Sequence, residues 1–253
     1  MTIDNSGAVS WGACDGSGKR RGRSLDGLPK IANCACPVCR PRRCGVIMAA
    51  AGVDSNFLGA AAIHSLTAKT PAQSAAIPRL REYVDAWPEN LSLGSGVMLQ
   101  GSASRAGKTH LAVSVLRGVL EKFGLDYATG SDVPPVWFSN FVNYAKEWQT
   151  FYSIPKSSDF DAPDSRAYQL NKRLLGAAEN MKVAKLLVLD DLGAHKPSEF
   201  VTNILYDVVN VRLSAHLPTI FTTNLSPGEI ALRYDDRTLG RIQEMSADNV
   251  FQF

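Results

Sequence analysis

Short runs of consecutive hydrophobic residues alternate along the chain with longer stretches in which hydrophobic residues recur at helical spacing. The short runs lie at 97–100, 136–139, 186–189 and 218–224, and they predict strands. Helical spacing at 111–120, 143–152 and 201–211 predicts helices, and a loop rich in Pro, Ser and Asp is expected at 153–165. Strands and helices are therefore expected to alternate over most of the chain.

The composition changes near residue 44. The first 44 residues carry a net charge of +5, and because the whole 253-residue chain carries +3, the remainder carries −2. All five cysteines lie in this first block: Cys14, Cys34, Cys36, Cys39 and Cys44. We therefore divide the chain into a cysteine-rich module at 1–50, a linker at 51–70 and a second domain at 71–253.

The overall composition is ordinary for a folded protein. Hydrophobic residues make up 45% and charged residues 20%, which argues against wholesale disorder. The early apolar stretch at 45–53 is too short to span a bilayer, and no secretory signal is recognisable at the N-terminus. We expect a cytoplasmic protein that does not contact a membrane.

The cysteine spacing is typical of a structural metal site. Cys36 and Cys39 form a Cys-x-x-Cys pair, in which a tight turn can direct both sulfurs at one tetrahedral ion. Cys14 and the following Asp-Gly-Ser-Gly resemble half of a second pair, but a tryptophan occupies the position expected for its partner. At most four thiolates bind, so the remaining ligand would be Cys34 or Cys44. We expect zinc, and the alternatives are an iron–sulfur centre or no metal.

A loop ending in Gly-Lys-Thr connects the predicted strand 97–100 to the predicted helix 111–120. Strand, glycine-containing loop and helix form the context that a phosphate-binding P-loop requires. Backbone N–H groups would surround the phosphates, the Lys108 ammonium would contact the outer phosphates, and the Thr109 hydroxyl would bind Mg²⁺. The predicted nucleotide-binding residues are Gly101, Ser102, Ala103, Ser104, Arg105, Ala106, Gly107, Lys108, Thr109 and His110.

This loop departs from the usual P-loop spacing. A first glycine is expected five residues before Gly107, where the chain has Ser102, and Gly101 lies one residue earlier. The middle of the loop carries Arg105 and Ala106 in place of glycine. Either the loop holds an extra residue or it tolerates serine, and in both cases we expect weaker nucleotide binding.

Two aspartates follow the hydrophobic run 186–189. In P-loop NTPases, a carboxylate at the end of a buried strand holds Mg²⁺, and another group orients the attacking water. We assign the first role to Asp190 and the second to Asp191. Aspartate is one methylene shorter than the glutamate of many related ATPases, so we expect slow hydrolysis. A solvated Asp-Asp turn is the alternative to this assignment.

Three segments, in this order, resemble the AAA+ ATPases of the DnaC/DnaI helicase-loader and IstB group. They are Gly-Lys-Thr-His-Leu-Ala at 107–112, Leu-Leu-Val-Leu-Asp-Asp-Leu-Gly at 186–193 and Pro-Thr-Ile-Phe-Thr-Thr-Asn-Leu-Ser at 218–226. The resemblance covers about 65–250. It implies an α/β fold, the AAA+ P-loop ATPase fold with a five-stranded, mainly parallel sheet sandwiched by helices. It also implies hydrolysis of ATP to ADP and phosphate.

The resemblance implies roles for residues after the last of these strands. Asn224 corresponds to the sensor that contacts the γ-phosphate and the attacking water. The segment 236–242 resembles the one that holds the arginine finger; Arg241 is the closer match, and Arg237 would share its helix face. In this family the finger reaches the nucleotide of a neighbouring subunit, which implies self-association through the ATP sites. A surface ion pair is the alternative for Arg241.

The family also implies partners. Loaders of the DnaI kind carry a cysteine-rich zinc domain that docks on the replicative helicase, whereas IstB-type proteins more often begin with helices. The resemblance therefore favours an ATP-dependent loader of a hexameric, DnaB-like helicase onto single-stranded DNA in bacterial or phage replication. Loaders also have an extra helical element that contacts single-stranded DNA, and the aromatic helix 143–152 matches its place. Core packing is the more frequent role for a residue such as Trp148.

Two other functions stay open from the sequence. One is an IstB-like transposition ATPase that acts on duplex DNA. The other is an adaptor that binds nucleotide without sustained hydrolysis. Two features suggest the adaptor. The P-loop is irregular, and the given sequence ends at Phe253, before the position at which the family has a further nucleotide-sensing arginine.

Overall fold

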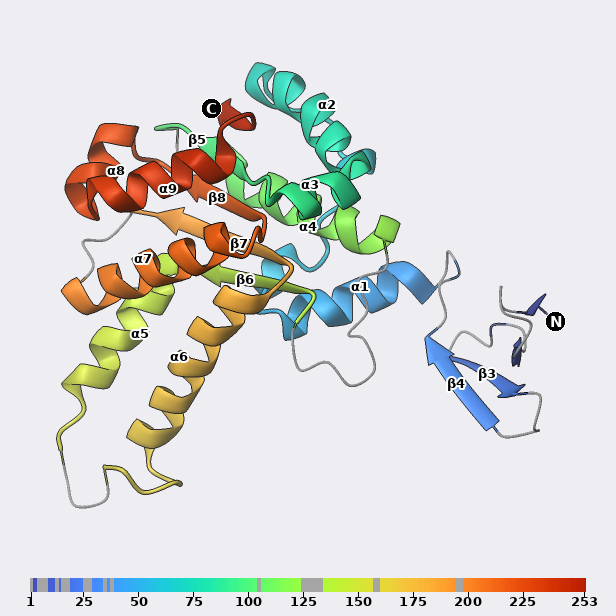
Figure 1. Cartoon of the computed structure of the whole chain (residues 1–253), viewed down its shortest axis with the longest axis horizontal. Helices are drawn as coiled ribbons and strands as arrows, with labels where there is room; N and C mark the ends of the chain where they lie inside the picture. Colours follow the sequence, from blue (N-terminus) through green and yellow to red (C-terminus); the bar gives the residue numbers. More distant parts are fainter. Residues whose placement is uncertain are drawn as a thin grey trace.

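The computed structural model describes residues 2–3, 9–11, 14, 19–24, 29–33, 36, 39–103, 106–123, 134–156, 160–193 and 198–253. These residues form two sheets (Figure 1). The smaller sheet is antiparallel, with strand order β1-β2-β3-β4. It consists of β1 (Thr2–Ile3), β2 (Val9–Trp11), β3 (Lys19–Ser24) and β4 (Pro29–Asn33).

The larger sheet has the strand order β6-β7-β8-β5-β9, and all its neighbouring strands are parallel. Its strands are β5 (Val97–Gln100), β6 (Val136–Asn140), β7 (Leu186–Leu192), β8 (Thr219–Thr223) and β9 (Val250–Gln252). The predicted α/β fold with a five-stranded parallel sheet is therefore confirmed. Parallel strands bring their carboxyl ends to one edge of a sheet, and this edge carries the polar residues described below.

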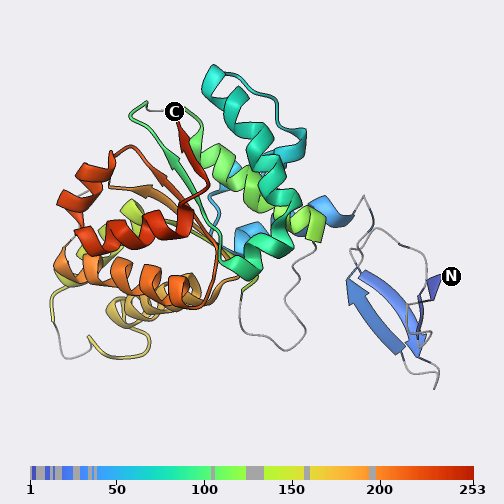
Figure 2. The ribbon, with the colours of Figure 1, turned by 45° about the horizontal axis from the view of Figure 1, so that its top comes forward.

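Helices cover both faces of the larger sheet. The core of one face includes residues of α1 to α4, and that of the other includes residues of α5 to α9 (Figure 2). The helices are α1 (Cys39–Ala50), α2 (Pro71–Asp85), α3 (Trp87–Leu93), α4 (Lys108–Phe123), α5 (Phe141–Ser153), α6 (Arg166–Val183), α7 (Glu199–Ser214), α8 (Pro227–Arg233) and α9 (Asp236–Ser246). Within the described ranges, no helix is long and apolar enough to cross a membrane.

Burial on both faces explains the uninterrupted hydrophobic runs. On β7, Leu186 and Val188 lie in the core shared with α1 to α4. The alternate residues Leu187 and Leu189 lie in the core shared with α5 to α9. Because successive side chains of a strand point to opposite faces, a strand covered on both sides needs hydrophobic residues at every position.

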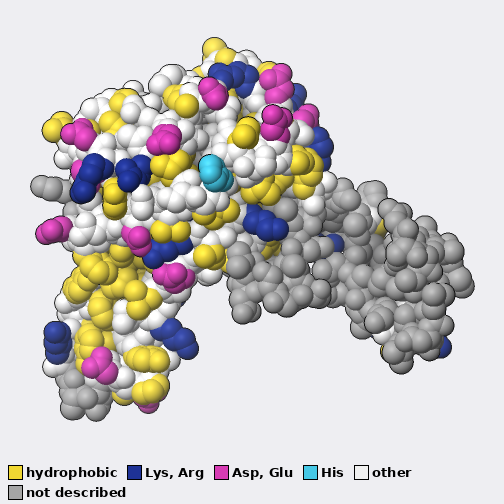
Figure 3. Space-filling model, in the orientation of Figure 1, with side chains coloured by type: hydrophobic (Ala, Val, Ile, Leu, Met, Phe, Trp, Pro, Cys, Tyr) yellow, Lys and Arg dark blue, Asp and Glu magenta, His cyan; other side chains and the backbone are white. Residues whose placement is uncertain are grey.

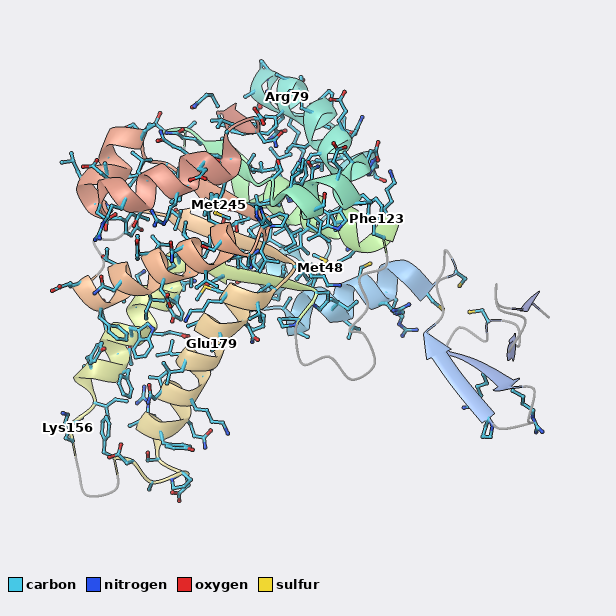
Figure 4. The ribbon with its side chains drawn as sticks, viewed as in Figure 1. Met48, Arg79, Phe123, Lys156, Glu179 and Met245 are labelled. Atoms are coloured by element: carbon cyan, nitrogen blue, oxygen red, sulfur yellow. The ribbon has the colours of Figure 1, made fainter. Side chains whose placement is uncertain are left out.

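The segment 51–70, which we expected as a linker, packs against the larger domain. It contains the short 3-10 helices η1 (Ser55–Phe57) and η2 (Ile63–Ser65), and Ile63 is fully buried in the core. Helix α1 enters the same core through Met48 (Figure 4). The Phe138 N–H on β6 donates a hydrogen bond of 2.8 Å to the Ala51 carbonyl. The functional division at residues 50 and 70 stays a prediction, but the packing does not break there.

Helices α5 and α6 form a hairpin that projects from the larger domain (Figure 1). The hydrophobic pattern predicts α5, whereas α6 was not predicted from the sequence. Trp148 of α5 is only 2% exposed and makes edge-to-face contacts with Tyr144 and Phe200. Trp148 therefore has the core-packing role that we gave as the more frequent one.

Buried Arg212 on α7 holds the amino-terminal ends of two strands of the larger sheet. Its guanidinium donates hydrogen bonds to the carbonyls of Ala184 (2.7 Å) and Pro218 (2.6 Å), just before β7 and β8, and its Nε–H donates to the Thr219 hydroxyl (2.8 Å). Burial lowers the pKa of Arg212 to about 9. These contacts fix α7 against β7, which carries Asp190 and Asp191, and against β8, which ends just before Asn224.

Candidate nucleotide-binding site

A pocket of about 450 Å³ lies at the carboxyl edge of the larger sheet. It is bounded by the loop before α4, by the ends of β6, β7 and β8, and by the η1 segment. The lining residues are Phe57, Ala106, Gly107, Lys108, Thr109, His110, Asn140, Asp190, Asp191, Thr222, Thr223 and Asn224. The structure thus brings together the end of the predicted P-loop, both predicted acidic residues and the predicted sensor asparagine.

The P-loop begins directly after β5 and ends where α4 begins. Gly101 has φ 151° and Gly107 has φ 90°, a region that favours glycine. A side chain at position 101 would overlap the carbonyl oxygen of Phe253. Five residues separate the two glycines, where the usual motif has four. Of the predicted loop residues, Ser104 and Arg105 lie outside the described residues.

Lys108 is the first residue of α4, and its side chain folds back along the loop. Its ammonium donates hydrogen bonds to the carbonyls of Gly101 (2.7 Å) and Ala103 (3.0 Å). Burial lowers the pKa of Lys108, and the nearby Asp191 carboxylate opposes this effect. The ammonium therefore lies inside the curve of the loop, where it can contact a phosphate.

Asp190 is the polar centre of the site and is only 3% exposed. Its Oδ1 accepts hydrogen bonds of 2.7 Å from the hydroxyls of Thr109 and Thr222. Its Oδ2 accepts a hydrogen bond of 3.0 Å from the Asn140 amide. The Thr109 hydroxyl and the Asp190 carboxylate are hard oxygen ligands in direct contact, and this donor set fits Mg²⁺.

Asp191 lies on an irregular part of β7. Its φ is 60°, which is unusual for a residue other than glycine, and the register with β8 shifts between Leu189 and Leu192. The Asp191 N–H donates a hydrogen bond of 2.8 Å to the Thr222 hydroxyl. Burial, and then the negative charge of Asp190, raise the pKa of Asp191, whereas Lys108 and Lys146 oppose the rise. The bulge turns the second acidic side chain towards the pocket.

The end of β8 supplies the other wall of the pocket. Thr223 is buried, and its hydroxyl donates to the Leu192 carbonyl over 2.7 Å and accepts from the Leu225 N–H over 3.0 Å. These bonds fix the chain on both sides of the exposed Asn224, which lines the pocket. Asn224 is thus placed on a rigid strand end opposite the P-loop.

A second pocket of about 260 Å³ adjoins the first at Gly107 and His110. It is formed by α4, by the start of α2 and by the chain before α2. His110 contacts the Phe57 ring edge-to-face at 6.4 Å, and burial, and then Lys69, lower the pKa of His110. The remaining lining residues are Leu66, Thr67, Lys69, Gln73 and Leu111.

Arg237 and Arg241 lie on α9, away from this pocket's lining. Both guanidinium groups stack over the Tyr206 ring of α7, at 5.1 and 4.9 Å from its centroid. The Arg241 Nε–H donates a hydrogen bond of 2.8 Å to the Asn210 side chain. Within one chain, neither arginine is among the residues that line the nucleotide pocket.

Three of the five cysteines lie together. The sulfur atoms of Cys14, Cys36 and Cys39 are all within 4.8 Å of one another, with Cys14 at 3.4 Å from Cys39 and at 3.5 Å from Cys36. Four thiolates around a tetrahedral zinc ion are separated by about 3.8 Å, so the three sulfur atoms fit a zinc site. Cys34 lies outside the described residues. Cys44 is 3% exposed and belongs to the hydrophobic core with Met48, apart from this cluster.

Three polar residues of the candidate nucleotide site were not predicted from the sequence. Asn140 and Thr222 donate to Asp190, and Gln73 of α2 donates to the P-loop carbonyl of Ala106 over 2.9 Å. Asn140 and Thr222 could have been noticed as polar residues at the ends of hydrophobic strands. Gln73 lies in a helix 33 positions before Ala106, and its sequence context carries no comparable signal.

No protein-family model matches the chain. Its sequence is 24% identical over 237 aligned residues to the replicative helicase loader DnaI of Bacillus subtilis (strain 168), covering 91% of this chain. The match spans 65% of that relative's length, slightly less than two thirds.

Solved structures of replication proteins are similar to the larger domain. The crystal structure of the DnaC helicase loader matches with a TM-score of 0.57 and 22% identity, over 79% of this chain and 99% of that one. The replication initiator DnaA bound to AMPPCP and single-stranded DNA matches with a TM-score of 0.54 and 14% identity, over 79% of this chain and 50% of that one. The chain therefore has the AAA+ P-loop fold, and its sequence resembles that of a replicative helicase loader.

Proposed function

We propose that this protein is an ATP-driven loader that places a hexameric, DnaB-like replicative helicase on single-stranded DNA. The main support is the similarity to DnaI over 91% of the chain. A match of that extent is longer than residues 51–253, so it includes part of the cysteine-rich module at 1–50. A protein that shared only the ATPase domain with helicase loaders would not be expected to resemble them in the cysteine-rich module.

The geometry of the pocket supports binding and hydrolysis of ATP. Lys108 and the N–H groups at the start of α4 would hold the β- and γ-phosphates. Thr109 and Asp190 would bind Mg²⁺, which when bound neutralises phosphate charge. Asp191 would accept a proton from the attacking water, and Asn224 would orient that water. A carboxylate with a raised pKa is a stronger base, which suits this role for Asp191.

We further propose that Arg241 acts on the ATP of a neighbouring subunit. Its Nε–H is held by Asn210 and its guanidinium plane by Tyr206, so the side chain is oriented before any partner arrives. An arginine placed in this way can stabilise the charge that develops on a transferred phosphoryl group. The protein would then hydrolyse ATP as an oligomer, and Arg237 would support the same interface.

The cysteine-rich module would dock on the helicase. We propose that zinc is held by Cys14, Cys36, Cys39 and, as the fourth ligand, Cys34. Cys39 is the first residue of α1, and the other end of α1 is bonded to β6 at Phe138. The metal would thus fix the small module to a helix that is itself anchored on the ATPase sheet.

Contact with single-stranded DNA is proposed for the α5–α6 hairpin. Hydrophobic side chains gather on its surface (Figure 3), where Tyr152 is 56% exposed. The ring of Phe200, at the start of α7, contacts Tyr152 and is 41% exposed. Lys156 lies beyond the end of α5, near the tip of the hairpin (Figure 4). Exposed aromatic rings next to a positive charge suit base stacking and phosphate contact, and they are better placed than the buried Trp148.

A helicase-loading assay tests this function. The purified chain is added to a hexameric DnaB-like helicase and a circular single strand that carries an annealed oligonucleotide, and the rate of oligonucleotide release is measured with ATP. Wild-type protein and Lys122→Ala should raise the rate, since Lys122 lies at the far end of α4 in a surface ion pair with Asp85. Lys108→Ala should not raise it.

The alternative functions predict other outcomes. One outcome would overturn the loader proposal in favour of an IstB-like ATPase. In it, the chain neither captures nor stimulates the helicase, and it binds duplex DNA in preference to single strands. Helicase capture with nucleotide binding, but without sustained phosphate release when helicase and single-stranded DNA are both present, would indicate an adaptor. We also propose that the protein acts in the cytoplasm, because both of its proposed partners, the replicative helicase and single-stranded DNA, would be present there.

A further inference from the structure

The amino-terminal turn of α2 is attached to the P-loop by the side chain of Gln73. The Gln73 Nε2 donates a hydrogen bond of 2.9 Å to the Ala106 carbonyl, and its Oε1 accepts one of 2.8 Å from the Lys69 N–H. The Gln73 N–H is itself bonded to the hydroxyl of Thr70, the N-cap of α2, over 3.2 Å. Both ends of the amide are therefore occupied, which fixes its orientation.

The peptide that Gln73 holds joins Ala106 to Gly107, the first residue of the Gly-Lys-Thr turn of the loop. In a planar trans peptide the C=O and N–H groups point in opposite directions. When Gln73 binds the Ala106 carbonyl, it therefore also sets the direction of the Gly107 N–H. Gly107 has φ 90°, and a glycine of this kind has little intrinsic preference that would orient the peptide without such a contact.

Space around Gly107 supports the same assignment. A Cβ atom at position 107 would lie 2.7 Å from the Gln73 Nε2, so the amide packs directly on this residue. At the other side of the loop, the Lys108 ammonium binds the carbonyls of Gly101 and Ala103. The loop is thus held at two places, by Lys108 from within and by Gln73 from α2.

We propose that Gln73 is a positioning residue of the nucleotide site, which turns the Ala106 carbonyl away from the phosphates and the Gly107 N–H towards them. Without the amide, this peptide can rotate and present an oxygen to the anion, which repels it. Gln73 also lines the second pocket with Lys69 and His110, so a ligand in that pocket contacts the residue that fixes the loop. This inference rests on the proposed ATP site.

Titration calorimetry with Mg²⁺–ATP on the full chain tests the proposal, together with phosphate release at saturating ATP. Gln73→Ala should raise the dissociation constant about tenfold, the effect of one lost hydrogen bond of this kind, and change the turnover at saturation by less than about threefold. Gln73→Met, which keeps the length of the side chain and loses both hydrogen bonds, should weaken binding equally. Ser74→Ala is the matched control on the same turn. The Ser74 hydroxyl donates to the Thr70 carbonyl, so the variant should leave the dissociation constant unchanged.

The outcomes separate this proposal from the site assignment. Wild-type affinity in both Gln73 variants, with binding abolished in Lys108→Ala, would overturn the role of Gln73 and leave the site intact. Unchanged affinity with a reduced turnover at saturation would also overturn it. Binding retained in Lys108→Ala would overturn the site and the proposal together. If Gln73→Ala does not fold, Gln73→Met decides, since it fills the same space beside Gly107.

Discussion

The Thr109 hydroxyl donates a hydrogen bond of 2.7 Å to the Asp190 carboxylate, although the two residues are 81 positions apart in the sequence. One lies in the first turn of the helix after the P-loop, and the other lies near the end of β7, two strands away from β5 in the sheet. Their contact depends on the strand order, which places β8 between β7 and β5. The two residues proposed to bind Mg²⁺ are therefore already in place to share one ion.

Asp190→Asn should abolish the dependence of nucleotide binding on Mg²⁺ and also destabilise the fold. Asp190 accepts three hydrogen bonds, and an amide replaces one acceptor oxygen by a donor that faces another donor. We expect the free energy of unfolding to fall by about 1–3 kcal/mol, the cost of a buried unsatisfied polar group. Urea unfolding and ATP titrations with and without Mg²⁺ measure both effects.

The control for this prediction is Asp207→Asn. Asp207 forms an exposed ion pair with Lys182, and its loss should change the free energy of unfolding by less than about 1 kcal/mol. If Asp190→Asn binds nucleotide with an unaltered Mg²⁺ dependence, Asp190 is not a ligand of the ion.

Asp191→Asn should lose hydrolysis, keep ATP binding and gain stability at neutral pH. In the folded chain the pKa of Asp191 is raised above the ordinary value of 3.8, so the charged form is disfavoured there. The resulting destabilisation is absent below 3.8, grows as the pH rises towards the folded pKa, and is then constant. Asparagine removes it and also tolerates the φ of 60°.

Thermal unfolding as a function of pH measures this effect. The midpoint of Asp191→Asn should exceed that of the wild type at neutral pH, and the difference should shrink as the pH falls to 3.8. Asp161→Asn, at an exposed position, is the control and should follow the wild type. A wild-type hydrolysis rate in Asp191→Asn would rule out its role as the base.

Arg241→Ala should bind ATP like the wild type and lose at least about tenfold in hydrolysis, because an arginine finger acts on the transition state and not on the ground state. Mixing this variant with Lys108→Ala should restore part of the activity. In the mixture, subunits with an intact ATP site meet neighbours with an intact Arg241.

A mixture of two variants that are both defective in the ATP site is the control for this complementation. Lys108→Ala mixed with Asn224→Ala should therefore stay inactive, whereas Arg241→Ala mixed with Asn224→Ala should regain activity. Full hydrolysis by Arg241→Ala alone would instead support a surface role, in which Arg241 bonds to Asn210 and stacks on Tyr206 within its own chain.

Metal content should depend on Cys14, Cys36 and Cys39 but not on Cys44. Elemental analysis of freshly purified protein should find about one zinc per chain, and Cys36→Ser should lower this content because a ligand is lost. Cys44→Ala should keep the zinc and lower the free energy of unfolding by about 1 kcal/mol, since it removes one buried atom from the core. Zinc loss in Cys44→Ala would contradict the assignment of ligands.

The choice between Cys34 and Cys44 shows why spacing alone left the fourth ligand open. Both cysteines lie within five residues of the Cys36–Cys39 pair. The tertiary structure places Cys39 and Cys44 on one helix, α1, where residues five positions apart point about 140° away from each other. Cys39 then faces the cysteine cluster while Cys44 faces the ATPase core.

The fold class and the types of residue in the candidate nucleotide site could be predicted from the amino-acid sequence alone. Hydrophobic runs at β5, β6, β7 and β8 predicted the strands, because burial on both faces requires such runs. The glycines and Lys108 of the P-loop and the acidic pair after β7 follow from local rules of backbone shape and charge.

The distant side chains that complete that site could not be predicted from the sequence, because they depend on how the elements pack. Asn140 reaches Asp190 because β6 lies beside β7, and Gln73 reaches Ala106 because α2 packs next to α4. Strand order and helix packing come from the fit of the whole core, and no local pattern of hydrophobic and polar residues encodes them. For that reason the phosphate-binding chemistry could be predicted from the sequence, whereas the residues that hold its geometry could not.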